Sequence, residues 1–147
     1  MLVDQPRVDL CRYRLEKAER FLNDAKSTIA QDMCETAANR SYYAIFHTVR
    51  ALLALDGKDF KKHSGVISYF QQQYIKTGVF DKEFSDILNM AFSLRTESDY
   101  KDFYVISRED VIRQVEDAER FLYEIKRYIE SLLNPTDEVY GAEMVPR

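Results

Sequence analysis

The sequence contains few residues that interrupt helices. Its 147 residues include only three prolines, Pro6, Pro135 and Pro146, and only four glycines. Proline removes a backbone donor and breaks helices, so no proline prevents helix formation between residues 7 and 134. Runs of β-branched residues are also few. The sequence therefore predicts an all-α protein, and its length fits one domain with a hydrophobic core of its own.

What else is missing disfavours several classes of protein. No apolar run approaches the roughly 20 residues that cross a bilayer, and the first ten residues lack the basic and apolar regions of a secretory signal. The two cysteines, Cys11 and Cys34, and the two histidines match no metal-ligand spacing, and no glycine-rich phosphate loop occurs. We therefore expect a cytoplasmic protein without a metal or another cofactor. Because the net charge is −4, a nucleic-acid site must be a local basic patch.

Hydrophobic periodicity predicts an up-and-down bundle of about five helices. An apolar stripe from Cys11 to Ile29, with 4-3-4-3-4 spacing, indicates the first helix. Cap residues and stop signals bound the helices, which are expected at 8–31, from about 32 to Gly57, from a Ser64 cap to Thr77, after Asp81, and from a Ser107 cap to Leu133. Residues 1–134 are expected to form the bundle. Residues 135–147 are expected to be a tail that is either disordered or docked on a partner.

Two of these predicted helices resemble each other. Residues 16–26 (EKAERFLNDAK) and 116–126 (EDAERFLYEIK) share the pattern E-x-A-E-R-F-L at an offset of 100. A solenoid would require more copies. The repeat instead predicts two long helices packed side by side, with the same face outward.

The second predicted helix contains the least polar run of the chain, and yet it holds Arg40, His47 and Arg50. At about 100° per residue, His47 returns to within roughly 20° of Arg40, with Tyr43 on the same side. A helix this apolar is normally covered on both sides. We expect its own domain to cover the apolar face, and a partner to cover the motif side together with the small residues placed there: Ala37, Ala44 and Ala51.

Arg40 and His47 are the candidate catalytic residues. Histidine can take or give a proton near neutral pH, and arginine carries a permanent charge that binds phosphate. Together these side chains suit the cleavage of RNA without a metal ion. The histidine would act on the 2′-hydroxyl or the leaving oxygen, and the arginine would stabilise the charged phosphorane. The alternative is a structural pair, either salt-bridged or partly buried.

The run ANRSYYAIFHTVRALL resembles the signature helix of HEPN domains, in which a histidine follows an arginine after four to six residues. Six residues separate Arg40 from His47. The runs KKHSGVISYFQQQYIKTGVFD and LRTESDY resemble later segments of the same family, in the same order. The resemblance covers roughly residues 8 to 133. It is to the branch of short stand-alone HEPN proteins.

This resemblance implies a homodimer in which the Arg/His helices of two subunits form a cleft. Many HEPN proteins are metal-independent endoribonucleases that leave a cyclic phosphate. Many also form toxin–antitoxin pairs with a minimal nucleotidyltransferase. Arg40 and His47 would then be catalytic, and the neighbouring cleft residues would be Asn39, Ser41, Tyr43 and Arg50. In many family nucleases Asn, Asp or His follows the arginine, where this chain has Ser41. The alternative is a non-catalytic dimeric module that binds a nucleotide, a nucleic acid or a nucleotidyltransferase in the same cleft.

Two further clusters have alternative interpretations. The first cluster consists of Arg95, Asp99 and Tyr100. It either joins the cleft rim or forms a helix-end cluster of caps and ion pairs. The other is either a solvated loop or a lip that attracts phosphate: Lys58, Lys61, Lys62 and His63.

Overall fold

The structure is a computed structural model that describes residues 4–100 and 106–134, without the side chains of residues 98–100. All regular elements in these ranges are helical, which confirms the predicted all-α bundle. The elements are α1 (Gln5–Ala30), α2 (Cys34–Leu55), α3 (His63–Phe70), the π-helical segment η1 (Gln71–Ile75), α4 (Lys82–Tyr100) and α5 (Arg108–Leu133). In the described ranges, no helix is both long and apolar enough to cross a bilayer.

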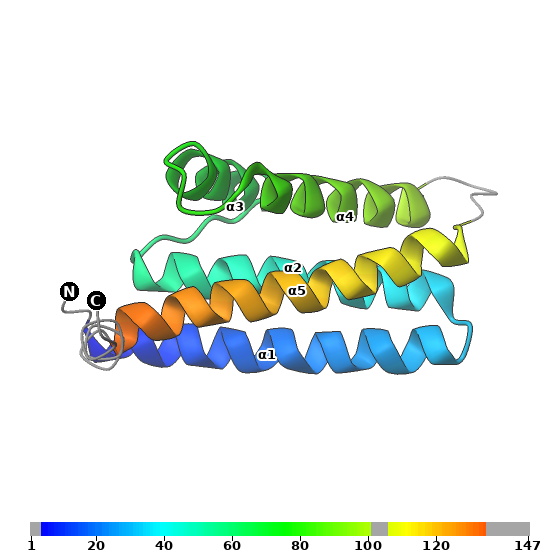
Figure 1. Cartoon of the computed structure of the whole chain (residues 1–147), viewed down its shortest axis with the longest axis horizontal. Helices are drawn as coiled ribbons and strands as arrows, with labels where there is room; N and C mark the ends of the chain where they lie inside the picture. The colour runs from blue at the N-terminus through cyan, green and yellow to red at the C-terminus, as the bar shows by residue number, and fades with distance from the viewer. Residues whose placement is uncertain (1–3, 101–105, 135–147) are drawn as a thin grey trace, which may run out of the picture.

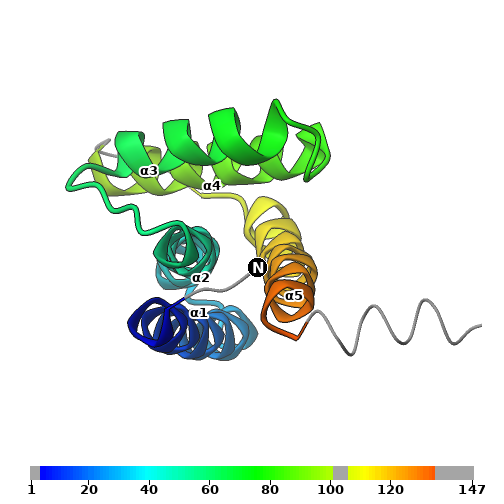
Figure 2. The same cartoon turned by 90° about the vertical axis from the view of Figure 1, so that its left-hand side faces the viewer.

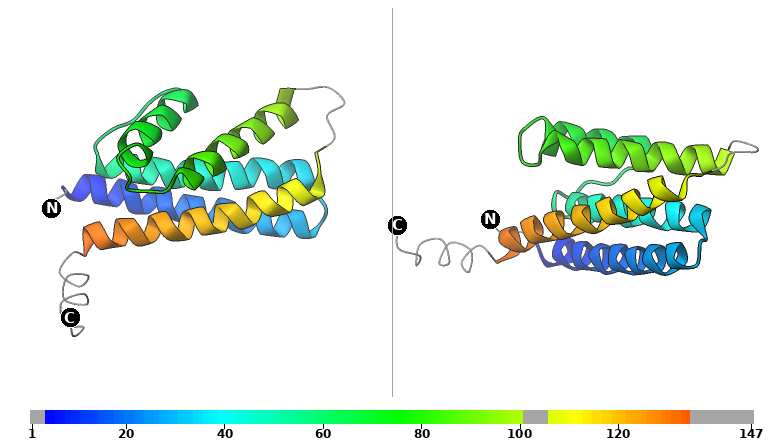
Figure 3. Two further views of the ribbon diagram at one scale, coloured as in Figure 1. Left: turned by 45° about the horizontal axis from the view of Figure 1, so that its top comes forward. Right: turned by 45° about the vertical axis from the view of Figure 1, so that its right-hand side comes forward.

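The second helix, α2, lies at the centre of the bundle (Figure 1). An end-on view shows α1, α5 and the α3–α4 pair around three sides of it (Figure 2). Two further views show the same layers, with α3 and α4 on the side opposite α1 (Figure 3). The most extensive helix–helix contact joins α1 to α2. This arrangement leaves one side of α2 without a covering helix.

Several helix ends follow the predicted cap residues. The Ser107 hydroxyl accepts a hydrogen bond from the Asp110 N–H (3.4 Å) at the start of α5. Gly57 has a φ of +67° after the end of α2, a left-handed conformation that glycine adopts without strain. The next N–H, of Lys58, donates back to the carbonyl of Leu53 (3.0 Å), which completes a Schellman cap.

The third predicted helix differs from the structure at both ends. It begins at His63 after an N-cap at Lys62, so the predicted Ser64 cap is wrong and Ser64 lies in the first turn. The helix does not continue in α form to Thr77, because it widens into η1 after eight residues. The wider turn carries Tyr74, which is buried. The Tyr74 hydroxyl donates to a carboxylate at the end of α2 (2.6 Å).

The alanine side of α2 is not the surface that the sequence pattern predicted. Ala37, Ala44 and Ala51 are 0% exposed in the single chain, and they belong to core clusters that include residues of α1. On the helical wheel the centre of the alanine row lies about 100° from Tyr43 and about 60° from His47. Their small side chains allow α1 to approach closely, so no partner is needed to cover them.

The first and last helices pack antiparallel, side by side, as their sequence repeat predicted (Figure 1). Two ion pairs at matching positions of the repeat link them: Lys126 with Glu19 (2.6 Å), and Lys26 with Glu119. The predicted common outward face is present except at the phenylalanines: Glu16, Arg20 and Lys26 are exposed, as are Glu116, Arg120 and Lys126. Phe121 is fully buried, whereas the matching Phe21 is only partly buried and packs beside α2.

The domain boundary was predicted between residues 134 and 135. The last helix ends at Leu133, with Asn134 as its C-cap residue. The predicted tail, residues 135–147, lies outside the described residues.

Candidate functional site

The open side of α2 carries the arginine–histidine motif. From residue 37 to residue 55, the only side chains that are not classed as buried are Asn39, Arg40, Tyr43 and Arg50. Asn39 lies four residues before Tyr43, Arg40 lies three before it and Arg50 lies seven after it, so the four residues lie along one side of the helix. His47 belongs to the same row but is only 7% exposed. We call these five residues the motif stripe.

His47 lies in a mostly apolar setting. Its ring stacks on Phe21 of α1 (5.3 Å between centroids) and on Tyr43 (5.8 Å). Its Nδ1 atom is buried without a hydrogen-bond partner in the described part of the chain. Burial lowers the pKa of His47 to about 4, with help from nearby positive charges: Lys17, Arg50 and Arg14. The imidazole is therefore neutral at pH 7, and it can accept a proton.

Arg40 lies two helical turns from His47 along the motif stripe. Seven residues correspond to about 10 Å along the helix axis. The Arg40 side chain is partly buried, and its guanidinium donates to the Asn39 side-chain oxygen. The two motif residues of one chain thus share a face of α2, two turns apart.

Of the predicted cleft rim, the structure places Arg95 beside the motif stripe. Its Nη2 donates to the Tyr43 hydroxyl (3.3 Å). Its guanidinium carbon lies 5.6 Å from the ring centroids of both Tyr42 and Tyr43, a cation–π distance. The side chains of the other two predicted rim residues, Asp99 and Tyr100, lie outside the described residues.

Ser41 does not belong to the motif stripe. It is 0% exposed, and its hydroxyl donates to the Ala37 carbonyl (2.7 Å) and accepts from Nε2 of Gln114 on α5 (2.7 Å). The prediction of a cleft role for Ser41 fails because a one-residue step from Arg40 turns its side chain by about 100°, toward α5. Gln114 was missed in the sequence, where its only signal is its place beside the apolar residue Val115 of the last predicted helix.

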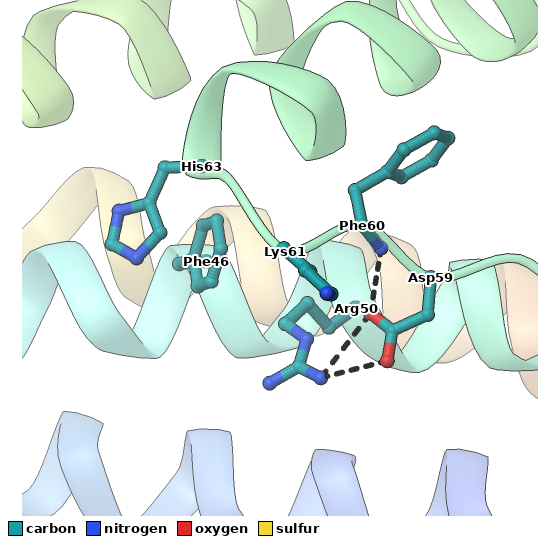
Figure 4. Close-up of a pocket in the computed structure, with 6 residues that line it drawn as sticks. All are labelled: Phe46, Arg50, Asp59, Phe60, Lys61 and His63. Atoms are coloured by element: carbon teal, nitrogen blue, oxygen red, sulfur yellow. Dashed lines mark hydrogen bonds and ion pairs between the residues drawn. The ribbon is translucent and has the colours of Figure 1, made fainter.

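A pocket of about 390 Å³ adjoins the motif stripe at Arg50 (Figure 4). Its walls come from α2 and from the segment that leads into α3: Phe46, Arg50, Asp59, Phe60, Lys61 and His63. The four predicted lip residues therefore separate into two groups. Lys61 and His63 line this pocket, whereas Lys58 and Lys62 are exposed and do not line it.

The carboxylate of Asp59 bonds to two arginine side chains at the pocket. Asp59 accepts from the Phe60 N–H (2.9 Å), from Nη2 of Arg50 (3.3 Å) and from Nη2 of the buried Arg14 (3.4 Å). Burial tends to raise the pKa of Asp59, but the Phe60 N–H and the two guanidinium groups hold it below its usual value. Sequence reasoning missed Arg14, whose only signal is its place beside the apolar stripe residue Leu15.

The second histidine also approaches α2. Nδ1 of His63 is 2.9 Å from the Tyr42 hydroxyl oxygen. The centroid of the His63 ring lies 4.2 Å from that of Phe46. The Phe46 centroid lies 5.9 Å from that of His47. Burial, followed by the charges of Arg95 and Arg50, lowers the pKa of His63. Both histidines of the chain therefore border the same phenylalanine, and the fold brings together residues that are 16 positions apart.

The fold and the site define a small all-α protein whose central helix exposes an arginine–histidine row beside a basic pocket. The sequence matches the HEPN domain family over residues 11–128, so the chain belongs to that family, as the motif predicted. It is 37% identical to a UPF0332 protein of Thermotoga maritima, over 84% of this chain and 93% of that protein. It is 34% identical to a UPF0332 protein of Archaeoglobus fulgidus, over 83% of this chain and 97% of that protein. It is 32% identical to a Methanocaldococcus jannaschii protein named "Putative toxin MJ0142", over 78% of each chain.

Proposed function

We propose that the protein is a metal-independent endoribonuclease of the toxin type, active as a homodimer. One observation carries this proposal: from residue 37 to residue 55 of α2, the side chains that the described helices leave unburied all lie on the motif stripe, which holds Arg40 and His47. The toxin names of two relatives support it. We assign the activity to the bundle of residues 1–134 and place it in the cytoplasm, where cellular RNA is the substrate.

The proposed reaction is an internal transesterification. Neutral His47 accepts the proton of the 2′-hydroxyl as the 2′-oxygen attacks the adjacent phosphorus. Arg40 stabilises the negative charge of the pentacoordinate phosphorane. The bond to the 5′-oxygen breaks, and protonated His47 returns its proton to this oxygen as it leaves. The products are a 2′,3′-cyclic phosphate and a 5′-hydroxyl, so neither water nor a metal ion is consumed.

The homodimer follows from the spacing along the motif stripe. A two-fold axis pairs the same surface of both subunits. If the two stripes cross near Tyr43, Arg40 of one subunit approaches His47 of the partner subunit. The phosphate would then lie between two helices, at a cleft that one chain alone provides only in part.

The test is cleavage of total RNA and of tRNA in EDTA by the wild type and by His47→Ala. We expect cleavage by the wild type, cyclic phosphate ends, and no cleavage by the variant. Circular dichroism and sedimentation of both proteins control for folding and assembly. Equal cleavage by the two proteins, or none by a folded dimeric wild type, would contradict the proposal.

The second candidate is a non-catalytic dimeric module that uses the same stripe to bind a nucleotide, a nucleic acid or a nucleotidyltransferase partner. The observation that favours it is the burial of His47, which restricts access to the imidazole. Under this alternative neither protein cleaves RNA, but a partner encoded beside the gene co-purifies with the wild type. Loss of co-purification in Tyr43→Glu would place that partner on the motif stripe.

A further inference from the structure

The pocket beside α2 has an excess of positive charge on a protein whose net charge is negative. Arg50 and the buried Arg14 both bond to the single carboxylate of the pocket, Asp59, and Lys61 lines the same pocket, which leaves a local charge of +2 while His63 is neutral. Asp59 holds the Arg50 guanidinium through Nη2 alone, and Figure 4 shows that the rest of this group is not bonded to the other pocket residues drawn.

The chain geometry around the pocket favours an anion as well. The first residue of α3 is His63, so the N-terminal end of this helix borders the pocket (Figure 4). The partial positive charge of a helix N-terminus adds to that of the side chains. Phe46 and Phe60 form apolar walls beside these polar groups. A phosphate group attached to an organic body fits this combination of charge and apolar surface.

We propose that this pocket binds a phosphate group of the RNA strand next to the scissile one, with Arg50, Lys61 and His63 as its ligands. This inference rests on the proposed function, because Arg50 belongs to both the motif stripe and the pocket. Phe46 separates the ring of His63 from that of His47. The pocket therefore holds a neighbouring phosphate, which keeps the strand in register while His47 and Arg40 act on the bond that is cleaved.

The contact with Tyr42 lets His63 act as a donor to phosphate. Burial raises the pKa of Tyr42, so its hydroxyl stays protonated. It can donate to Nδ1 of neutral His63, or accept from Nδ1–H after protonation, which leaves Nε2–H for the phosphate. A bound phosphate favours the protonated form. The charges of Arg95 on α4 and Arg50 on α2 oppose protonation. Asp59 and Lys61 are the other charged groups that line the pocket with His63.

The chain offers a matched pair of lysines for the first test. Lys61 lines the pocket, and its neighbour Lys62 is equally charged and exposed but does not. The ligand is a 2′-O-methyl RNA oligonucleotide, which cannot be cleaved. We expect Lys61→Gln to weaken binding about 10-fold and to reduce the salt slope by about 0.7, the value for one phosphate contact on a single strand. Lys62→Gln should change affinity less than about twofold. Equal losses in the two variants would overturn the proposal.

The second test separates phosphate from RNA and needs no variant in the pocket. Only two histidines occur in the chain, so imidazole NMR signals report on His63, with His47→Ala used for assignment. Saturating inorganic phosphate should shift the His63 signals and raise its measured pKa, and the oligonucleotide should do the same. Unmoved His63 signals in the presence of both ligands would refute the pocket.

The two proposals fail in different ways. Binding at the pocket without any cleavage would reject the nuclease and retain the phosphate site. Cleavage that depends on His47, with no difference between Lys61→Gln and Lys62→Gln, would retain the nuclease and reject the site.

Discussion

His47 combines a catalytic residue type with the surroundings of a core residue. Its ring is held between Phe21 and Tyr43, and only 7% of the residue is exposed. Enzymes commonly shift the pKa of a base by burial, but a very low pKa also makes a base weak. A phosphate between two subunits would raise the pKa of His47 again, because it adds a negative charge to a site surrounded by cations.

The buried histidine makes stability dependent on pH. The pKa of His47 is about 4 in the folded chain, compared with about 6.5 in an unfolded one. Protons therefore bind preferentially to the unfolded state, so stability is full above pH 6.5 and falls as the pH drops toward 4. We expect a loss on the order of 3 kcal/mol across this window.

Urea unfolding at pH 7, 5.5 and 4.5 at constant ionic strength measures this loss. The control is His47→Leu, in which most of the pH dependence between 6.5 and 4.5 should disappear. An unchanged pH dependence in that variant would mean that His47 is not the group responsible.

At the scale of elements, the alanine row and the motif stripe lie next to each other on the helical wheel of α2, but they have different surroundings. The alanines face the core of their own chain, and the motif stripe stays open. A charge in the alanine row would have to be buried against α1 without a partner, which is among the most destabilising kinds of substitution. We expect Ala44→Glu to lower the free energy of unfolding by about 3 kcal/mol or more.

Asn39→Glu is the matched control, because the same charge enters the same helix on the open side. Asn39→Glu should lower the free energy of unfolding, measured by urea titration, by less than about 1 kcal/mol. An Ala44→Glu protein as stable as the wild type, but with altered assembly, would instead make the alanine row an interface between subunits.

Much of the element pattern was predictable because apolar spacing and caps are local signals. The α1 stripe, the Gly57 end of α2 and the Ser107 cap of α5 all follow from neighbours in the sequence. The π-helical segment was not predicted, and its residue Tyr74 makes a tertiary hydrogen bond to the end of α2 that no local signal indicates. The start of α3 was misplaced because the helix begins without a side-chain cap.

The candidate site was predictable in its motif but not in its surroundings. The seven-residue spacing placed Arg40, Tyr43 and His47 in one row, and the row is there. Which side of that row α1 covers depends on packing between helices, so the alanines and Ser41 were misjudged. Arg14 on α1 donates to the carbonyl of Arg50, 36 residues later in the chain, and to Asp59, and no local pattern in the sequence predicts such contacts.

At the scale of the whole molecule, the proposed site requires two copies of the chain. Tyr43 is the central residue of the motif stripe, so a two-fold axis near it would bring both Tyr43 side chains together. We expect the wild type to sediment as a dimer, and Tyr43→Glu to sediment as a monomer, because two carboxylates would face each other across the axis.

The matched control is Met90→Glu on α4, at a residue that is 68% exposed and lies outside the motif stripe. It should remain a dimer. A wild type that is monomeric at all accessible concentrations would contradict the dimer, as would identical behaviour of the two variants.

The reciprocal ion pairs between α1 and α5 have a consequence for assembly. Each helix carries one glutamate and one lysine at equivalent places, so the two pairs are copies of each other. A copy of α1 from another chain would offer α5 the same charges as its own α1 does. Exchange of terminal helices between molecules would break no charge pairing, so this seam does not distinguish self from neighbour.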